Sequence, residues 1–193
     1  MEINVETILC AILVEDYKPC QKIMTHYLHG LGYQVDLAVD GVTAIQNINN
    51  KAYDLVVQDI GLRGIGKEII RVARHSHFNQ GTPLIVWSAY VNRNDEKKYL
   101  DWGADSVLIK ACQIPDLEKA IQQCFLTPRY EREFNYKLKI LQKKWEQNCP
   151  SEWVKKINDL RHLPFSILNE ALHIIREYQQ WSDFHANERN ARS

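Results

Sequence analysis

The chain has 193 residues and a mass of 22.6 kDa, which fits one domain with an extension or two small domains. Apolar residues make up 45% of it and charged residues 25%, a balance that is typical of folded proteins and excludes a wholly disordered or fibrous chain. Lys plus Arg and Asp plus Glu each number 24, so the net charge shows no general affinity for nucleic acid or anionic membrane.

Short apolar segments alternate with amphipathic segments from the N-terminus to about residue 127. The apolar segments are rich in Val, Ile and Leu and predict strands at 8–14, 33–39, 55–58, 84–87 and 106–109. The amphipathic segments predict helices at 19–30, 42–49, 67–75, 94–102 and 115–126. Five strand–helix units indicate an α/β fold of (βα)₅ type, a doubly wound parallel sheet with helices on both faces.

The remaining residues, 128–193, predict helices only, so we divide the chain into a domain at 1–127 and an all-α C-terminal region at 128–193. Apolar side chains with helical spacing run through this region, and its aromatic residues are too many to leave exposed. We expect them to pack on each other, on the first domain, on a second copy of the chain or on a partner. The candidates for an output or dimer contact are Tyr130, Phe134, Leu138, Trp145, Trp153 and Tyr178.

The cysteine content and the hydropathy of the sequence indicate in which cellular compartment the protein functions. The five cysteines are odd in number and widely spaced, without a Cys-x-x-Cys pair or a His at metal-ligand spacing, which predicts reduced structural thiols. No apolar run approaches the ~18 residues that a membrane span requires. We therefore expect a cytoplasmic protein that makes no contact with a membrane.

Polar side chains follow four of the five predicted strands. Glu15 and Asp16 follow the first strand, Asp59 the third, Ser88 the fourth and Lys110 the fifth. The carboxyl ends of parallel strands meet at one crevice, so we expect these side chains to converge there. Neighbouring carboxylates repel one another, and Mg²⁺ (or Mn²⁺) with oxygen ligands would hold them ionised. A hydroxyl and an ammonium beside them favour a phosphoryl group, with an aspartate as its nucleophile.

These residues carry a resemblance to the receiver domain of bacterial two-component response regulators, the CheY-like family, over residues 8–126. The matching stretches stand in the family's order and at its separations, and together they are highly specific. They are ILVED at 12–16, DLVVQDIGL at 54–62, IVWSA at 85–89 and GADSVLIK at 103–110.

The resemblance implies that Asp59 accepts a phosphoryl group from a histidine kinase or a phosphotransfer protein. It also implies that the Ser88 hydroxyl and the Lys110 ammonium contact that group, in a regulatory phosphoacceptor domain rather than an enzyme. The implied metal ligands are Asp16, Asp59, the backbone carbonyl of Gly61 and, through water, Glu15.

Three features depart from the family's pattern. Ala111 follows the lysine where the family has a proline, and Val107 stands where the family has a switch Tyr or Phe, so rotation of that ring is not the readout here. The loop after the phosphoacceptor also lacks the usual proline. Trp87 and Tyr90 flank Ser88 and are the candidate aromatic residues for a switch.

Three functions stay open on the sequence. We favour a response regulator whose phosphorylation controls homodimerisation or binding of a protein target through the helical region. A DNA-binding transcriptional regulator is the second, since a helix-turn-helix would fit at 153–176, although its second helix carries Glu170 and Glu177. The third is a degenerate receiver that acts as a constitutive scaffold.

Overall fold

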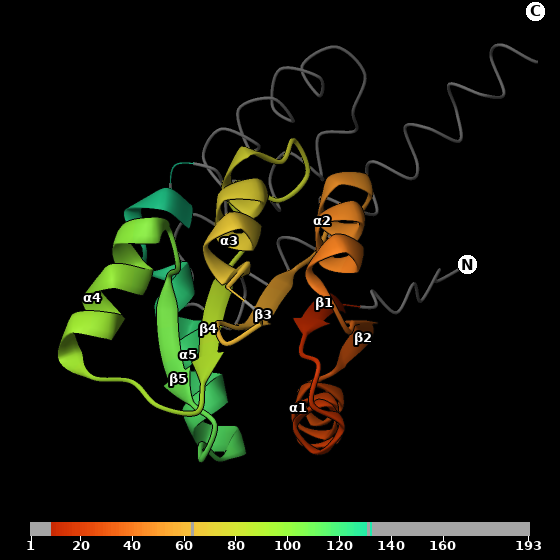
Figure 1. Cartoon of the computed structure of the whole chain (residues 1–193), viewed down its shortest axis with the longest axis vertical. Helices are drawn as coiled ribbons and strands as arrows, with labels where there is room; N and C mark the ends of the chain where they lie inside the picture. The colour runs from red at the N-terminus through yellow and green to blue at the C-terminus, as the bar shows by residue number, and fades with distance from the viewer. Residues whose placement is uncertain (1–8, 63, 131, 133–193) are drawn as a thin grey trace, which may run out of the picture. The chain divides into compact units, whose positions relative to one another are not determined.

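The computed structural model describes residues 9–62, 64–130 and 132, which belong to one compact unit of the chain. Five parallel strands alternate with five helices in this part (Figure 1). The strands are β1 (Leu9–Val14), β2 (Tyr33–Ala38), β3 (Leu55–Asp59), β4 (Leu84–Ser88) and β5 (Ser106–Ile109). The helices are α1 (Lys18–Gly30), α2 (Gly41–Asn50), α3 (Gly66–His75), α4 (Arg93–Trp102) and α5 (Ile114–Phe125). The predicted (βα)₅ fold is confirmed.

The strand order is β2-β1-β3-β4-β5, and every pairing is parallel. The chain first adds β2 on one side of β1 and then crosses to the other side to add β3. This reversal makes a topological switch point between β1 and β3, where ligands of doubly wound proteins bind beyond the carboxyl ends of the strands. The fold thus places the ends of β1 and β3 at the centre of a crevice.

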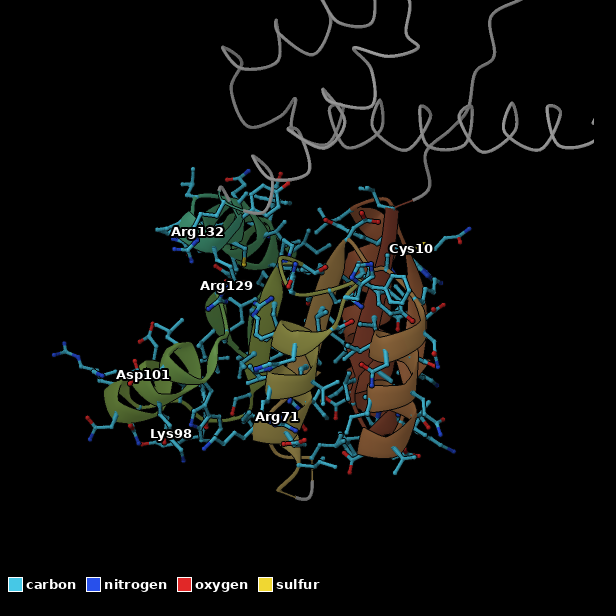
Figure 2. The ribbon with its side chains drawn as sticks, turned by 90° about the horizontal axis from the view of Figure 1, so that it is seen from above. Cys10, Arg71, Lys98, Asp101, Arg129 and Arg132 are labelled. Carbon is cyan, nitrogen blue, oxygen red and sulfur yellow. The ribbon has the colours of Figure 1, made fainter. Side chains whose placement is uncertain are left out.

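The core explains why the central strands read as continuous apolar runs. Ile12, Val56 and Val86 of the sheet pack in one cluster with buried residues of α2, α3 and α4. The intervening residues, such as Leu13 and Val57, point to the other face and are also fully buried. Helices α1 and α5 contact the sheet as well, so both faces are covered. The outer helix faces stay polar, as Arg71 of α3 and Asp101 of α4 illustrate (Figure 2).

The helix and strand ends follow local chemistry and differ by at most one residue from the sequence prediction. Asp40 caps α2 by accepting a hydrogen bond from the Thr43 N–H at 2.8 Å. Gly103 ends α4 with a φ of +118°, a conformation that favours glycine. The strands β3 and β4 each extend one residue further than predicted, to Asp59 and Ser88, so these two polar residues end the strands themselves.

The described chain continues past α5. Tyr130 is buried and packs edge-on against Phe125, with the two ring centroids 4.8 Å apart. Among the described residues, no helix has the length and apolarity to cross a membrane. Cys112 and Cys124 are buried, while Cys10 and Cys20 are half-buried. The other output candidates, Phe134, Leu138, Trp145, Trp153 and Tyr178, lie outside the described residues.

Candidate functional site

Three carboxylates meet at the carboxyl ends of β1 and β3. Glu15, Asp16 and Asp59 each offer an oxygen, and these oxygens all lie within 4.8 Å of one another. Glu15 is fully buried, Asp59 is 8% exposed and Asp16 is exposed. The cluster therefore has a buried floor and one side open to solvent.

Lys110 closes the cluster from the end of β5. Its Nζ lies 2.6 Å from Glu15 Oε2 and 3.0 Å from Asp59 Oδ2. Burial alone would lower the pKa of Lys110, but its hydrogen bonds to the two carboxylates outweigh burial and raise that pKa. Burial raises the pKa of Glu15, and the hydrogen bond from Lys110 offsets this only in part. The ammonium is thus charged and shared between two acids.

Backbone and amide donors fix the two buried carboxylate residues. The Gly61 N–H donates to Asp59 Oδ1 at 2.9 Å, and the Tyr17 N–H donates to Glu15 Oε1 at 3.1 Å. The side-chain amide of Gln21 donates to the Glu15 carbonyl at 2.9 Å. Tyr17 and Gln21 were not among the predicted site residues, and only their positions two and six places after Glu15 could have pointed to them.

The donor set fits a magnesium ion. All the candidate ligands are oxygens, and three carboxylates outnumber the one ammonium, so the cluster favours a hard cation. Gly61 also leaves the space beside Asp59 open. A side chain at this position would crowd the carboxylate, because its Cβ would lie only 3.3 Å from Asp59 Oδ1. The exposed side at Asp16 gives access to water, which Mg²⁺ retains in most protein sites.

Ser88 and the two candidate switch aromatics lie around the end of β4. Ser88 is 6% exposed, and its hydroxyl donates to the Tyr90 carbonyl at 2.9 Å. Trp87 is fully buried, whereas the Tyr90 side chain is 74% exposed. The two flanking aromatic residues thus differ in environment, with Trp87 in the core and Tyr90 on the surface. Their role in switching stays a prediction.

Strand order and site together define a CheY-like receiver fold. The structure is similar to the receiver domain of the sensor histidine kinase PA1611 from Pseudomonas aeruginosa, with 25% identity, a TM-score of 0.57, and coverage of 63% of this chain and 100% of that one. It is also similar to CheY4 of Vibrio cholerae, with 22% identity, a TM-score of 0.56, and coverage of 61% and 99%. Residues 11–122 match the response regulator receiver domain family, and the chain belongs to that family.

Sequence relatives carry the same domain within longer proteins. The response regulator ArlR of Staphylococcus saprophyticus is 33% identical over 107 residues, covering 55% of this chain and 47% of the relative. The transcription factor SKN7 of Candida albicans is 30% identical over 125 residues, covering 64% of this chain and 22% of the relative. The chain thus matches less than half the length of these curated relatives.

Proposed function

We propose that this chain is a response regulator in which Asp59 accepts a phosphoryl group from a histidine kinase or phosphotransfer protein. Phosphorylation then controls dimerisation or binding of a protein target through the C-terminal region. The observation that carries the proposal is Lys110 between Asp59 and Glu15, with Asp16 open to solvent beside them. Membership of the receiver family supports it.

Asp59 is the candidate nucleophile because its carboxylate is oriented from both sides. One oxygen accepts from the Gly61 N–H and the other pairs with Lys110. In the transfer, an Asp59 oxygen forms the new O–P bond while the N–P bond of a phosphohistidine breaks, and the donor imidazole keeps the electron pair. Lys110 lies within reach of the dianionic product and neutralises part of its charge.

The proposed phosphoryl transfer also requires a magnesium ion at the acidic cluster. The residues that would hold it are Asp16, Asp59, the Gly61 carbonyl and, through water, Glu15. When bound, the ion offsets the negative charge of the carboxylates and the incoming phosphoryl group. The similar PA1611 receiver domain is described with a magnesium ion coordinated in its active-site cleft, which supports the assignment.

Ser88 is the residue that would link phosphorylation of Asp59 to a change at the protein surface. Its hydroxyl bonds the neutral Tyr90 carbonyl, and a phosphoryl oxygen at Asp59 would be a stronger acceptor because it is charged. Exchange of one bond for the other frees the loop that carries the exposed Tyr90. Phosphorylation would then shift a pre-existing equilibrium between two loop arrangements.

The test is the mass of the purified full chain in solution, measured by light scattering with and without Mg²⁺ and beryllofluoride. We expect the phosphoryl mimic to bind and to shift the mass, and Asp59→Asn to abolish both effects. Asp101→Asn, an exposed acid on α4, is the matched control and should behave as the wild type. Absence of binding would identify the chain as a degenerate receiver. Binding without a change in mass would move the output to a heterologous partner.

A transcriptional output is the second candidate, since one relative is described as a transcription factor. That match covers 22% of the relative, so it supports the receiver domain alone. DNA binding would show a steep fall in affinity with rising salt, whereas a protein-interaction output would show no such DNA binding. A salt titration against duplex DNA therefore separates the two.

A further inference from the structure

Trp87 has the largest side chain among the fully buried residues that the structure describes. It occupies β4 directly before Ser88 and pairs in register with Leu108 of β5. The neighbouring residues of β4, such as Ile85 and Val86, are aliphatic and fill the core without any polar atom. An indole at this position, in register with Asp59 of β3, brings an aromatic face and an N–H donor to the strand ends that carry the acidic cluster.

The face of the indole lies against Lys110. The Lys110 Nζ is 5.2 Å from the centroid of the Trp87 ring. The lysine side chain is only 16% exposed, so this contact is largely removed from water, where a cation and an aromatic face attract one another most strongly. Lys110 thus has two charged partners, Glu15 and Asp59, and one uncharged partner, Trp87.

Cys112 follows Lys110 by two residues, at the other end of the loop 110–112. Burial raises the pKa of the Cys112 thiol. The indole N–H of Trp87 is buried as well. This N–H forms no hydrogen bond of normal geometry within the described part of the chain. The Cys112 N–H donates to the Ile109 carbonyl at 2.9 Å and closes a tight turn. Within the loop 110–112, Lys110 is thus the residue that lies against the Trp87 ring.

We propose that Trp87 is a positioning residue that holds the Lys110 ammonium over the phosphoacceptor cluster. The inference rests on the proposed function of Asp59. A lysine has a flexible stem of four carbons, and a fixed ring reduces the number of conformations open to it. The ring also carries no charge, so it can keep the ammonium in place while Lys110 exchanges a carboxylate partner for a phosphoryl oxygen.

The experiment compares beryllofluoride affinity in saturating Mg²⁺ for the full-length wild type, Trp87→Phe and Trp87→Leu. We expect Trp87→Leu to weaken the affinity by roughly tenfold, the size of a desolvated cation–π contact, and Trp87→Phe to keep most of it. Mg²⁺ affinity should not fall, because the candidate metal ligands do not include Lys110 and a displaced ammonium competes less with the ion for Asp59. If Trp87→Leu does not fold, Trp87→Met, whose unbranched and more flexible side chain adapts better to the space without a ring, replaces it.

A double-mutant cycle separates positioning from general packing. In a Lys110→Met background, Trp87→Leu should cause no further loss of beryllofluoride affinity. Trp102→Leu is the matched control, because Trp102 lies near two other lysines, with Lys98 Nζ 4.8 Å from its ring centroid. Its affinity should equal that of the wild type.

Two results would overturn the role of Trp87 and leave Asp59 as the phosphoacceptor: wild-type affinity in the aliphatic variant, or the same loss in both Lys110 backgrounds. A wild type that binds no beryllofluoride would overturn the proposed function itself, and the role of Trp87 with it.

Discussion

At the carboxyl ends of the strands three carboxylates gather and one ammonium pairs with two of them, whereas at the amino ends of β4 and β5 one carboxylate lies between two guanidinium groups. The second cluster centres on Asp105, whose Oδ2 is 2.6 Å from Arg74 Nη2 and whose Oδ1 is 2.9 Å from Arg129 Nη1. Arg129 belongs to the segment after α5 and is labelled in Figure 2. Both clusters are largely buried, but their charges are balanced in different ways.

The cluster around Asp105 is closed by the chain itself. Arg74 also donates to the carbonyls of Gly103 and Thr82, at 2.8 and 2.7 Å. Asp105 accepts a further bond from the Leu84 N–H at 2.9 Å. Burial raises the pKa of Asp105 and lowers that of Arg74, while the ion pair between them opposes both shifts. Such a fully partnered group stabilises the fold and leaves no position for a ligand.

The acidic cluster is left incomplete by the chain. Asp16 is exposed, and among the described residues Lys110 pairs with the other two acids of the cluster, Glu15 and Asp59. In this protein, an excess of carboxylates together with exposure to solvent distinguishes the candidate ligand site. A buried charge whose hydrogen-bond partners all come from the chain itself distinguishes the structural cluster around Asp105.

The largest expected effect is at the closed cluster. Asp105→Ala should lower the free energy of unfolding by about 3–5 kcal/mol, because it leaves the buried Arg74 without its counter-charge. Denaturant unfolding measures this directly. Asp101→Ala removes an exposed pair with Lys97 and should cost less than about 1 kcal/mol. Equal effects of the two variants would show that the Asp105 cluster is not structural.

Arg129 should matter less than Asp105, because its side chain is 35% exposed. Arg129→Gln should cost about 1–2 kcal/mol through its lost bonds to Asp105 and to the Gly103 carbonyl. The comparison variant is Arg71→Gln, which removes an exposed pair with Glu68. Chemical denaturation should show that Arg129→Gln lowers the free energy of unfolding clearly more than Arg71→Gln does. Equal losses in the two variants would mean that Arg129 does not stabilise the cluster.

Magnesium should stabilise the open cluster. At ten times its Kd, Mg²⁺ should raise the free energy of unfolding by about 1.4 kcal/mol, provided that it binds only the folded state. Asp16→Asn should abolish this gain while leaving metal-free stability within about 0.5 kcal/mol of the wild type, because Asp16 is exposed. Thermal unfolding with and without the ion tests both points. A gain that survives Asp16→Asn would place the ion elsewhere.

The smallest effect is expected at an exposed pair that belongs to neither cluster. Hydrogen bonds from Lys51 and then Tyr53 lower the pKa of Asp36 below its usual 3.8. A carboxyl whose pKa is lower in the folded than in the unfolded state stabilises the protein at pH values above its unfolded-state pKa. This stabilisation is lost as the pH falls through its folded-state pKa. The stability difference between wild type and Asp36→Asn should therefore be under about 1 kcal/mol at pH 6 and shrink towards pH 3. A constant difference would contradict the assignment.

Sequence reasoning reached the fold and the residues of the acidic cluster because both follow from local patterns. Apolar runs of strand length indicate a parallel sheet, and polar residues directly after them must gather at one edge. Asp105 gave no such signal, since its partners Arg74 and Arg129 are 31 and 24 residues away. The complete burial of Trp87, and its contact with Lys110, likewise depend on the packing of β4 against β5, which periodicity does not reveal.

Tyr130 and Arg129 bear on how the receiver could be separated from the rest of the chain. A chain shortened at residue 127, the boundary expected from the sequence, would lose the ring that covers Phe125 and one of the two cations that neutralise Asp105. An apolar patch would then face water beside an under-neutralised buried acid. A receiver fragment intended for separate study therefore needs to retain the residues through Tyr130.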